Sequence, residues 1–501
     1  MNNRKKEIVL AVLVFIAAIL LALNTTRYFF RIDMTENKSF TISNTTKEYI
    51  RSIPEEVNIT YYISDKIRTI APAASQIEDL LFEYAANSRK HVVVNSLDPA
   101  KHNMEGYVKN LGVTAQQVEI YDRNERAYST VYSGIIIQYL DKTEAIGFIL
   151  DAANLEYEVT SRIQKLVEGK SMKIGLLSGH ESNTVDFYYS FLQGDLSQNS
   201  EVQVFEWGQE IPSDISVLFV LGNKDISEGD LLPVDEYMMA GGKVIFCVDG
   251  VDVNMVDNLK ATKLETNPCL EMLKKWGITV NNDLVLDRYC KKITLKGTLP
   301  LNYPQWLSIN NKFVSKDNPV MAGFMGMDLL WASSIDIQPV EGLGYEQLMA
   351  STDDSWILTD YVSLSPFESY TTFNIASETK GSHPLGFMVS GKFHSAFTDK
   401  TSEDTKIIVV ADADFLSNLI EYSESPSNLI FAENAVQYMS NDSFMGIKTR
   451  SMRDMRLNKI SDIRTKIRAI LMVYAVNIFI IPLGIIIYGV VRYFRRKRKD
   501  A

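Results

Sequence analysis

Hydrophobic and polar positions alternate along the chain in short blocks whose period changes between two residues and about three and a half. Blocks of period two predict strands, and apolar residues spaced three or four apart predict helices. From residue 57 onward the blocks predict a strand, a helix, a strand, a helix and two strands. Their ranges are 57–63, 73–86, 91–97, 103–111, 130–139 and 144–149.

This β-α-β-α-β-β order is that of a thioredoxin-like domain, which we place at 31–153. A thiol oxidoreductase of that fold has Cys-x-x-Cys after the first strand, where a helix N-terminus lowers the thiol pKa. Here the same place has Ser64-Asp65-Lys66-Ile67, so no thiolate is available. We therefore expect a binding or spacer domain without redox chemistry.

A second and larger region follows the amphipathic helix predicted at 156–166. Its strands are nearly continuous apolar runs, at 173–178, 202–205, 217–221 and 243–248, and helices such as 187–196 and 233–239 separate them. Strands that are apolar on both faces predict a mostly parallel, doubly wound sheet covered by helices. We place this Rossmann-like domain at 154–440, with strands at 385–393 and 407–411 and a helix at 428–439.

Inside that region the pattern becomes irregular between about 287 and 380. Pro300, Pro304, Pro319 and Pro339 interrupt it, and proline cannot donate the backbone hydrogen bond that a central strand needs. The sequence therefore predicts a loop-rich insertion there.

Two long apolar runs lie near the ends of the chain, at 8–23 and 469–491. Runs of this kind predict transmembrane helices, in segments 1–30 and 469–491. The first is also compatible with a cleaved signal peptide, although Leu-Ala-Leu-Asn is a poor cleavage site. Basic residues precede the first run and fill the tail at 492–501, which places both termini in the cytoplasm and residues 31–465 outside it, so we predict a two-pass protein of the cell membrane.

Charge narrows the possible partners. The chain has a net charge of −11, and without the nine basic and two acidic residues of its tails the remainder has −18, which disfavours nucleic acid. The segment 441–468 is an exception. Arg450, Arg453, Arg456 and Lys459 recur there at helical spacing, as in a helix at lipid headgroups or in a solvated stalk.

Candidate chemistry gathers at predicted strand ends. His180 and Glu181 follow the first strand of the larger region, and Asp249, Asp412 and Asp414 follow later strands, at the edge where such sheets bind ligands. These five residues are the candidate ligand crevice. Three carboxylates and an imidazole are also metal ligands, but Asp is a common turn and cap residue, and we predict neither a metal nor a cofactor.

Catalytic motifs are incomplete. Gly169-Lys170-Ser171 has Gln164 where a phosphate loop needs its first Gly, and the loop-like segment 386–392 is followed by Phe393 where Ser or Thr must stand. Cys247 lacks the flanking glycines of a nucleophile elbow, and Cys247, Cys269 and Cys290 show no metal-ligand spacing. We therefore predict no catalytic residue and buried cysteines.

Short motifs follow one another in a fixed order along the chain: RIDMTENK at 31–38, FTIS at 40–43, NLEYEVT at 154–160, GHE at 179–181, the segment 231–248, WGI at 276–278, DLVLD at 283–287, DADFLSN at 412–418, NAV at 434–436 and PLG at 482–484. In this ordered set the chain resembles the GldG-type auxiliary components of gliding-motility-like ABC transporters. The family usually has Gly-His-Gly-Glu where this chain has Gly179-His180-Glu181-Ser182, which weakens a site built on that turn. The resemblance implies thioredoxin-like and Rossmann-like domains, an ABC-2-type permease and a separate ATPase.

Our first hypothesis is a non-catalytic auxiliary subunit that binds substrate or envelope components or relays motion from the permease. Asn477, Pro482, Gly484 and Gly489 in the second apolar run are the residues expected to pack against the permease within the lipid bilayer. The envelope component bound by such a subunit is expected to be a glycan, lipid or peptide. The alternative is a free-standing receptor for an envelope glycan or peptide. An envelope hydrolase is disfavoured because the sequence shows no nucleophile for it.

Overall fold

The structure of this chain is a computed structural model. It describes residues 41–122, 125–150, 152, 155–169, 172–179, 184–294, 299–316, 318–321, 326–360, 363–366, 380–423, 427–440 and 472. The chain divides into two compact units, Met1–Met452 and Arg453–Ala501, and all elements named below belong to the first. Within that unit, residues up to 169 form one sheet with its own core, and residues from 172 onward form a second sheet with separate cores.

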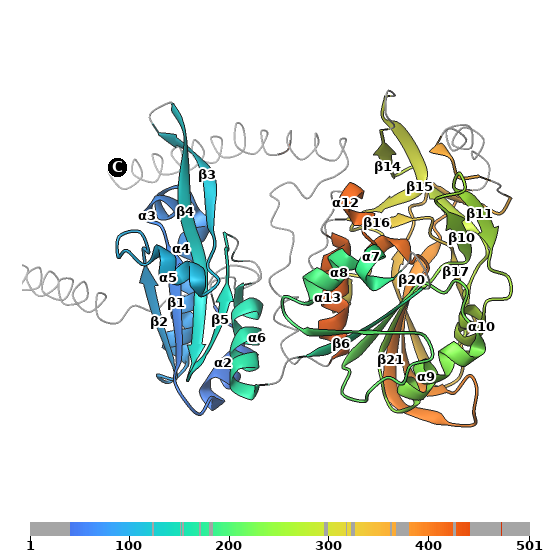
Figure 1. Cartoon of the computed structure of the whole chain (residues 1–501), viewed down its shortest axis with the longest axis horizontal. Coiled ribbons are helices and arrows are strands. Elements are labelled where there is room, and N and C mark those ends of the chain that lie inside the picture. Colours follow the sequence, from blue (N-terminus) through green and yellow to red (C-terminus); the bar gives the residue numbers. More distant parts are fainter. Residues whose placement is uncertain are drawn as a thin grey trace, which may run out of the picture. The chain divides into compact units, whose positions relative to one another are not determined.

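The first sheet has five strands in the order β2-β1-β4-β3, with β5 paired to β4 (Figure 1). The strands are β1 Val57–Ile63, β2 Val92–Leu97, β3 Ala115–Asp122, β4 Glu125–Tyr139 and β5 Lys142–Ile146. β1 is parallel to β2 and antiparallel to β4. The long β4 pairs with β3 through its first half and with β1 and β5 through its second half, so it holds the sheet together.

Helices cover both faces of this sheet. They are α2 Asn44–Ser52, α3 Asp65–Ile70, α4 Pro72–Asn87, α5 Glu105–Asn110 and α6 Leu155–Glu168. Apolar side chains of α2, α4 and α6, such as Val159 and Ile163, pack against Ile59 and Ile137 in one core. On the other face Val108 of α5 forms a smaller cluster with strand residues.

Glu156 joins two of these helices. It is buried in the first turn of α6, and its carboxylate accepts hydrogen bonds from the backbone N of Ser43 (2.6 Å) and the hydroxyl of Thr46 (2.7 Å). Ser43 is the N-cap of α2, and its own Oγ accepts from the backbone N of Thr46. One side chain from 110 residues away therefore completes the N-terminal cap of α2.

The strands at 57–63 and 91–97 and the helix at 73–86 were predicted to within a residue at each end. By contrast, β3 was missed and β4 begins before the predicted residue 130. The consecutive polar pair Gln116-Gln117 and the consecutive apolar pair Ile120-Tyr121 interrupt the alternation within β3, so its period-two pattern is weak. The thioredoxin-like assignment stays a prediction.

The second sheet has seven strands in the order β18-β20-β21-β9-β8-β6-β7. The strands are β6 Lys173–Ser178, β7 Glu201–Phe205, β8 Val217–Leu221, β9 Val244–Cys247, β18 Leu343–Ala350, β20 Pro384–His394 and β21 Thr401–Val410. From β7 to β21 all neighbours are parallel, and β20 and β18 extend the sheet in antiparallel fashion. The sheet is thus mostly parallel; the Rossmann-like assignment stays a prediction.

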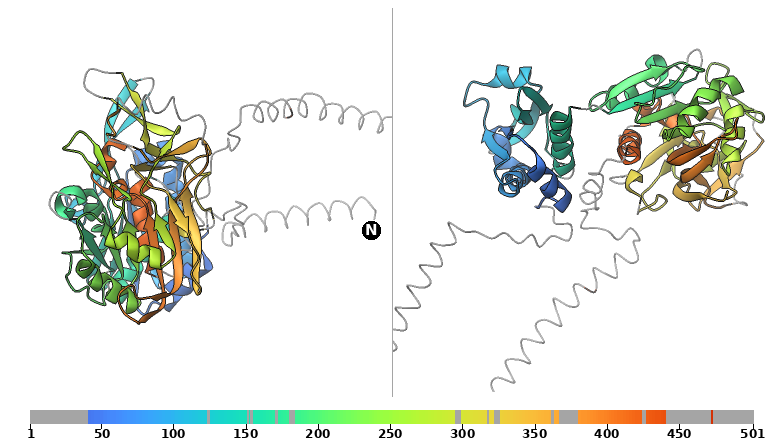
Figure 2. Two further views of the ribbon diagram at one scale, coloured as in Figure 1. Left: turned by 90° about the vertical axis from the view of Figure 1, so that its right-hand side faces the viewer. Right: turned by 90° about the horizontal axis from the view of Figure 1, so that it is seen from below.

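Both faces of the second sheet are buried under helices (Figures 1 and 2). Val217 and Phe219 of β8 pack into a core shared with α7 Val185–Tyr188, α8 Ser190–Leu196 and α13 Ser427–Met439. Leu218 and Val220 pack into the opposite core, shared with α9 Glu228–Met239 and α10 Pro268–Lys275. Alternate residues of one strand enter two cores, which explains the continuous apolar run.

The region predicted to be rich in loops, 287–380, contains short strands in small sheets. They include β13 Leu284–Asp287, β14 Cys290–Ile293, β15 Leu301–Ile309, β16 Met327–Leu330, β17 Ile335–Ile337 and β19 Ser355–Leu358. Pro304 lies inside β15, beside the register shift in the pairing with β14. A proline is tolerated at such an irregularity because no ladder hydrogen bond is needed from it there.

The predicted localisation as a two-pass membrane protein is contradicted. In the part of the chain that the structure describes, no helix is long and apolar enough to span a membrane. A span needs about 20 apolar residues in one helix, whereas α4, with 16 residues, carries Glu78, Asp79 and Glu83. The apolar runs at 8–23 and 469–491, and with them Asn477, Pro482, Gly484 and Gly489, lie outside the described residues.

Candidate functional site

The carboxyl ends of four parallel strands meet at one edge of the seven-stranded sheet. β6 ends at Ser178, β8 at Leu221, β9 at Cys247 and β21 at Val410. β6 has β7 on one side and β8 on the other, so the strand order changes direction at β6. Open parallel sheets bind ligands outside the carboxyl ends of their strands at such a switch point.

A cavity of about 40 Å³ lies at this edge, and we call it the crevice. It is lined by Gly179, Tyr189, Leu221, Gly222, Asn223, Lys224, Asp225, Asp249, Asp252, Ala413 and Asp414. A single water needs at least about 10–15 Å³. As lined by the described residues, the crevice therefore has room for a few waters or one small polar group, but not for a sugar ring.

Hydrogen bonds to the backbone of Asp249 and to one of its carboxylate oxygens fix this residue in the crevice. Its backbone N donates to Oδ1 of Asn223 (2.9 Å), and its carbonyl accepts from Nδ2 of the same residue (3.0 Å). Its Oδ1 accepts from the backbone N of Ala413 (2.7 Å), which ties β9 to the end of β21. Burial, followed by the charge of Asp414, raises the pKa of Asp249 well above its usual range.

Asp414 brings a second carboxylate to the same cavity. It opens the short 3-10 helix η3, Asp414–Leu416, and its Oδ1 accepts a hydrogen bond from the hydroxyl of Tyr188 (2.7 Å). Burial raises the pKa of Asp414 to about 6, against the lowering effect of the Tyr188 hydrogen bond. Asp249 and Asp414 therefore resist ionising together while no cation lies between them.

Asp412 has a structural task instead. It is completely buried and does not line the crevice. Its Oδ1 accepts from the backbone N of Asp414 (2.7 Å) and of Phe415 (3.0 Å), and its Oδ2 accepts from the backbone N of Leu330 (2.6 Å). It thus caps η3 and fastens β16 to the end of β21. Burial, and then Asp414 and Asp249, raise its pKa, while the N–H donors oppose that rise.

An ion pair flanks the crevice. Nζ of Lys224 lies 3.0 Å from Oδ2 of Asp252. Asp252 also contributes to the raised pKa of Asp249 and Asp414. The crevice thus presents mainly hydrogen-bond acceptors, and it suits a ligand group that donates hydrogen bonds or carries positive charge.

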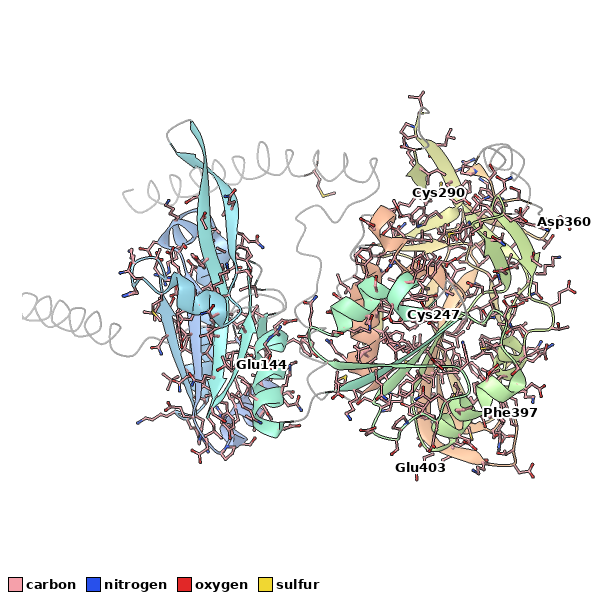
Figure 3. All side chains as sticks on the ribbon, in the orientation of Figure 1. Glu144, Cys247, Cys290, Asp360, Phe397 and Glu403 are labelled. Atoms are coloured by element: carbon pink, nitrogen blue, oxygen red, sulfur yellow. The ribbon has the colours of Figure 1, made fainter. Side chains whose placement is uncertain are left out.

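Cys247, the thiol nearest to these carboxylates in the sequence, is poorly suited to act as a nucleophile. It lies in the interior of the second sheet (Figure 3) and is fully buried. Burial, together with Asp412 and Asp249, raises its pKa well above the usual range, so the thiol stays protonated. In the described part of the chain no group of three or more His, Cys, Asp or Glu residues is arranged to hold a metal ion.

The structure brings together some of the predicted crevice residues and leaves others undecided. Asp249 and Asp414 line one cavity. Asp412 does not line it, but its Oδ1 accepts a hydrogen bond from the backbone N of Asp414. His180 and Glu181 lie outside the described residues, although Gly179, which precedes them, lines the crevice. The prediction for His180 and Glu181 therefore stays a prediction.

Sequence reasoning missed Asn223, Tyr188 and Lys224. Asn223 was detectable, because Gly222-Asn223 follows the apolar run 217–221 just as Gly179 follows 173–178. Tyr188 gave no such signal, since it comes from α7 and reaches Asp414 across 226 residues of sequence. Only the hydrogen bond to Asp414 in the folded structure identifies Tyr188 as part of the site.

Two aspartates in the family-like motifs serve the fold. Asp283 accepts hydrogen bonds from the backbone N and the hydroxyl of Ser334. Asp235, buried in α9, accepts from the hydroxyl of Ser395 and the backbone N of Ala396, and so holds the connection between β20 and β21. Recurrence of a motif in a family therefore does not make each of its carboxylates part of a ligand site.

In the first sheet, the position after β1 is occupied by an ion-pair cluster. The Ser64 hydroxyl accepts from the backbone N of Tyr132 (3.0 Å), and the Asp65 carboxylate contacts Lys101 and Arg68. The expectation of a binding or spacer domain without redox chemistry stays a prediction.

Comparison with known families gives two matches. A family model described as ABC-type uncharacterized transport system matches residues 171–446, more than half of the 501 residues. A domain of unknown function matches residues 36–138. The first match confirms the resemblance to auxiliary components of ABC transporters, and it covers every residue of the crevice.

Individual relatives add little about activity. An uncharacterized protein of Borreliella burgdorferi is 28% identical over 512 residues, which covers 100% of both chains. A ThuA-like protein from Bacteroides uniformis has a TM-score of 0.29 and 8% identity, covering 54% of this chain and 91% of that one. A beta-galactosidase from Rahnella sp. R3 has a TM-score of 0.27 and 11% identity, covering 57% and 35%. We draw no argument from structural likenesses of this size.

Proposed function

Because the chain belongs to the family of auxiliary components of ABC-type transport systems, we propose that it is a non-catalytic subunit that binds a ligand of the transport process at the crevice. The observation that carries this proposal is the position of the crevice. It lies at the switch point of the seven-stranded sheet, with the carboxylates of Asp249 and Asp414 in its lining.

The ligand group that fits best is a small cation, such as the primary amine of a larger substrate or of a component of the complex. An amine donates hydrogen bonds to carboxylates and offsets the repulsion between Asp249 and Asp414. Such a group would lower the pKa of Asp414 from about 6, because an adjacent positive charge favours the ionised form. Binding should therefore release protons and tighten as the pH rises from 5 to 7.5.

A binding function is favoured over catalysis by the chemistry of the lining. Burial raises the pKa of the Cys247 thiol, and among the described residues the lining of the crevice contains no serine, threonine or cysteine. A hydrolase that acts through a serine, threonine or cysteine would need such a nucleophile beside a base, whereas the described part of the crevice offers carboxylates next to a tyrosine hydroxyl. The family membership points in the same direction.

Thermal unfolding with amine probes tests the ligand assignment. We expect ethylamine or ethanolamine at millimolar concentration to raise the Tm of the full chain at pH 7.5 and much less at pH 5, since binding stabilises the native state. Asp414→Asn should abolish the shift. Asp404→Asn, a change on the exposed part of β21, should leave the shift intact. Equal shifts in both variants would contradict the assignment of the crevice.

Association with a transporter is tested separately. The tagged full-length chain is purified from detergent-treated cells, and co-purifying proteins are identified by mass spectrometry. We expect an ABC-2-type permease and an ATPase subunit in a fixed ratio, retained in Asp414→Asn. If neither co-purifies reproducibly, the subunit proposal fails and a free-standing receptor becomes the better explanation.

A further inference from the structure

Two lysines lie side by side in the seven-stranded sheet, away from the crevice. Lys406 belongs to β21, and Lys243 directly precedes β9. The two strands are parallel and pair Ile407 with Val244, so the lysines are cross-strand neighbours one step before that pair. Lys243 thus stands at the amino end of β9, whereas the carboxyl end of the same strand contributes to the edge that forms the crevice.

Both lysine side chains lie on the same face of the sheet. Side chains alternate between faces along a strand, and Ile408 of β21 and Ile245 of β9 belong to the core that α7, α8 and α13 share. Lys406 and Lys243, each two residues earlier, therefore point to that side. Lys406 Nζ lies 4.5 Å from the ring centroid of Tyr438 in α13, which agrees with this assignment.

Neither ammonium group forms an ion pair in the described part of the chain. Asp404, two residues before Lys406 on β21, is exposed and is not paired with it. By contrast, four other half-buried lysines lie 2.8–3.0 Å from a carboxylate oxygen: Lys165, Lys173, Lys224 and Lys291. The chain has 62 acidic against 51 basic residues, so the lack of a partner is a property of these two positions.

Two adjacent positive charges without a counter-charge are unfavourable. Like charges on neighbouring strands repel each other, and burial adds to the cost because it removes water from the charged groups. Burial, followed by the charge of Lys406, lowers the pKa of Lys243 accordingly. An anion between the two lysines would offset both the repulsion and the lost hydration.

A hydroxyl group extends this row of donors. β20 pairs Ser390 with Lys406, and Ser390 shares a face with Met388, a member of the same core. Among the described residues the Ser390 hydroxyl has no hydrogen-bond partner. Its cross-strand neighbour on β18 is Gly344, which has no side chain to cover it. Ser390, Lys406 and Lys243 thus present donors from three neighbouring chain segments, about 4.8 Å apart from one segment to the next.

We propose that Ser390, Lys406 and Lys243 bind a phosphate group, and we call these three residues the lysine site. A phosphate carries about two negative charges at pH 7.5, and its oxygens accept hydrogen bonds in several directions. It can therefore contact two ammonium groups and a hydroxyl at once, whereas a carboxylate brings only one negative charge. The lysine site is separate from the crevice and does not depend on the amine ligand proposed there.

The phosphate can be the free ion or an ester such as a lipid headgroup. Inorganic phosphate and glycerol 3-phosphate distinguish these sources, because the second probe carries the ester and the glycerol of a headgroup. Tighter binding of inorganic phosphate assigns the lysine site to the free ion, and tighter binding of glycerol 3-phosphate assigns it to an ester. Either order supports the site.

Thermal unfolding of the full-length chain tests the lysine site. We expect about 10 mM phosphate at pH 7.5 to raise the Tm by about 2 °C more than sodium chloride of equal ionic strength, since binding stabilises the native state. Lys243→Met with Lys406→Met should lose this gain, with an apparent Kd at least about tenfold higher. Lys260→Met, at an exposed lysine of β11, Lys260–Lys263, is the matched control and should keep it. Phosphate also stabilises proteins by exclusion from their surface, and that contribution is the same in all variants.

The repulsion between the lysines provides the second measurement. Without phosphate and at low ionic strength, Lys243→Met should have a higher Tm than the wild type, because it removes a half-buried charge beside Lys406. A variant that merely folds badly would have a lower Tm in both buffers. Equal phosphate gains in the wild type and the double lysine variant would overturn the proposal. The two lysines would then serve as counter-charges for the C-terminus of α13, whose last turn has no basic residue of its own.

Discussion

Among single residues, the aspartates that follow β9 and β21 differ in what their oxygens contact. Both oxygens of Asp412 are occupied by backbone N–H groups of Leu330, Asp414 and Phe415. Asp249 and Asp414 each have one oxygen in a hydrogen bond to the protein and line the crevice. The same residue type thus serves the fold at one position and ligand binding at the neighbouring ones.

Replacing Asp412 tests its structural task. Asp412→Ala leaves two buried N–H groups and one partly buried N–H group without their acceptor, and we expect it to lower the free energy of unfolding by about 3–5 kcal/mol. Asp412→Asn keeps one acceptor oxygen and should lose less. Urea denaturation measures both, with the exposed Asp404→Ala as the control expected to change stability by less than about 0.5 kcal/mol. A loss in Asp412→Ala no greater than in the control would contradict this role.

Asp249→Asn tests the repulsion in the crevice through its pH dependence. A carboxyl whose native pKa is raised contributes stability below its unfolded pKa of about 3.9, and this contribution is lost as the pH rises through the native pKa. For Asp414 that native value is about 6, and for Asp249 it lies higher than usual. Asn resembles the protonated acid and keeps the acceptor for Ala413.

The stability of the variant relative to the wild type should therefore increase as the pH rises from 5 to 8. We expect a difference of about 1 kcal/mol, the free energy of a shift of about one pKa unit. Thermal denaturation from pH 5 to 8 measures it, with Asp404→Asn as the control. Parallel profiles for Asp249→Asn and the wild type would show that the repulsion is unimportant.

At the scale of elements, a side chain of α6 completes the N-terminal cap of α2 and so joins the two helices. α2 is a nine-residue helix with a polar sequence, and isolated helices of that length are barely stable in water. Its N-terminus is completed by Glu156 of α6, and its Ile50 is buried against the first sheet. α2 therefore depends on contacts that its own sequence does not contain.

Glu156→Ala should loosen α2 selectively. We expect the free energy of unfolding to fall by about 2 kcal/mol, since one buried and one partly buried donor lose their acceptor. Hydrogen exchange of the α2 amides should become faster, while that of β8 and β9 in the second sheet stays unchanged. Glu168→Ala, at the other end of the same helix, is the matched control. Uniform acceleration across both sheets would instead indicate global destabilisation.

At the scale of the whole molecule, the described part of the chain has separate cores. Residues 42–166 supply the core of the first sheet, and residues 174–439 supply the two large cores of the second. Separate cores favour separate cooperative units, so a single unfolding equilibrium is not expected.

Calorimetry of the full chain should accordingly resolve two transitions. Glu156→Ala should lower the Tm of one, and Asp412→Ala should lower the Tm of the other. If both substitutions shift the same transition, or if one transition describes the whole curve, the two sheets unfold as one unit.

The sequence by itself determined the parts whose residues signal their environment locally. The apolar runs 173–178 and 217–221 predicted strands buried on both faces, because both sides of such a strand pack against helices. The order of short motifs pointed to the transport-system family. Terminal hydropathy, by contrast, led to a two-pass localisation that is contradicted, because no helix in the described part of the chain is long and apolar enough to span a membrane.

The tertiary structure alone decided which of the candidate residues share a site. Asp249, Asp412 and Asp414 look equivalent as strand-end aspartates, and only their contacts separate the two that line the crevice from the one that caps η3. Tyr188 and Asn223 reach them from elements far apart in the sequence. The physical reason is that hydrophobic periodicity reports the burial of a residue along its own element, whereas hydrogen bonds and charge repulsion depend on neighbours that only folding brings together.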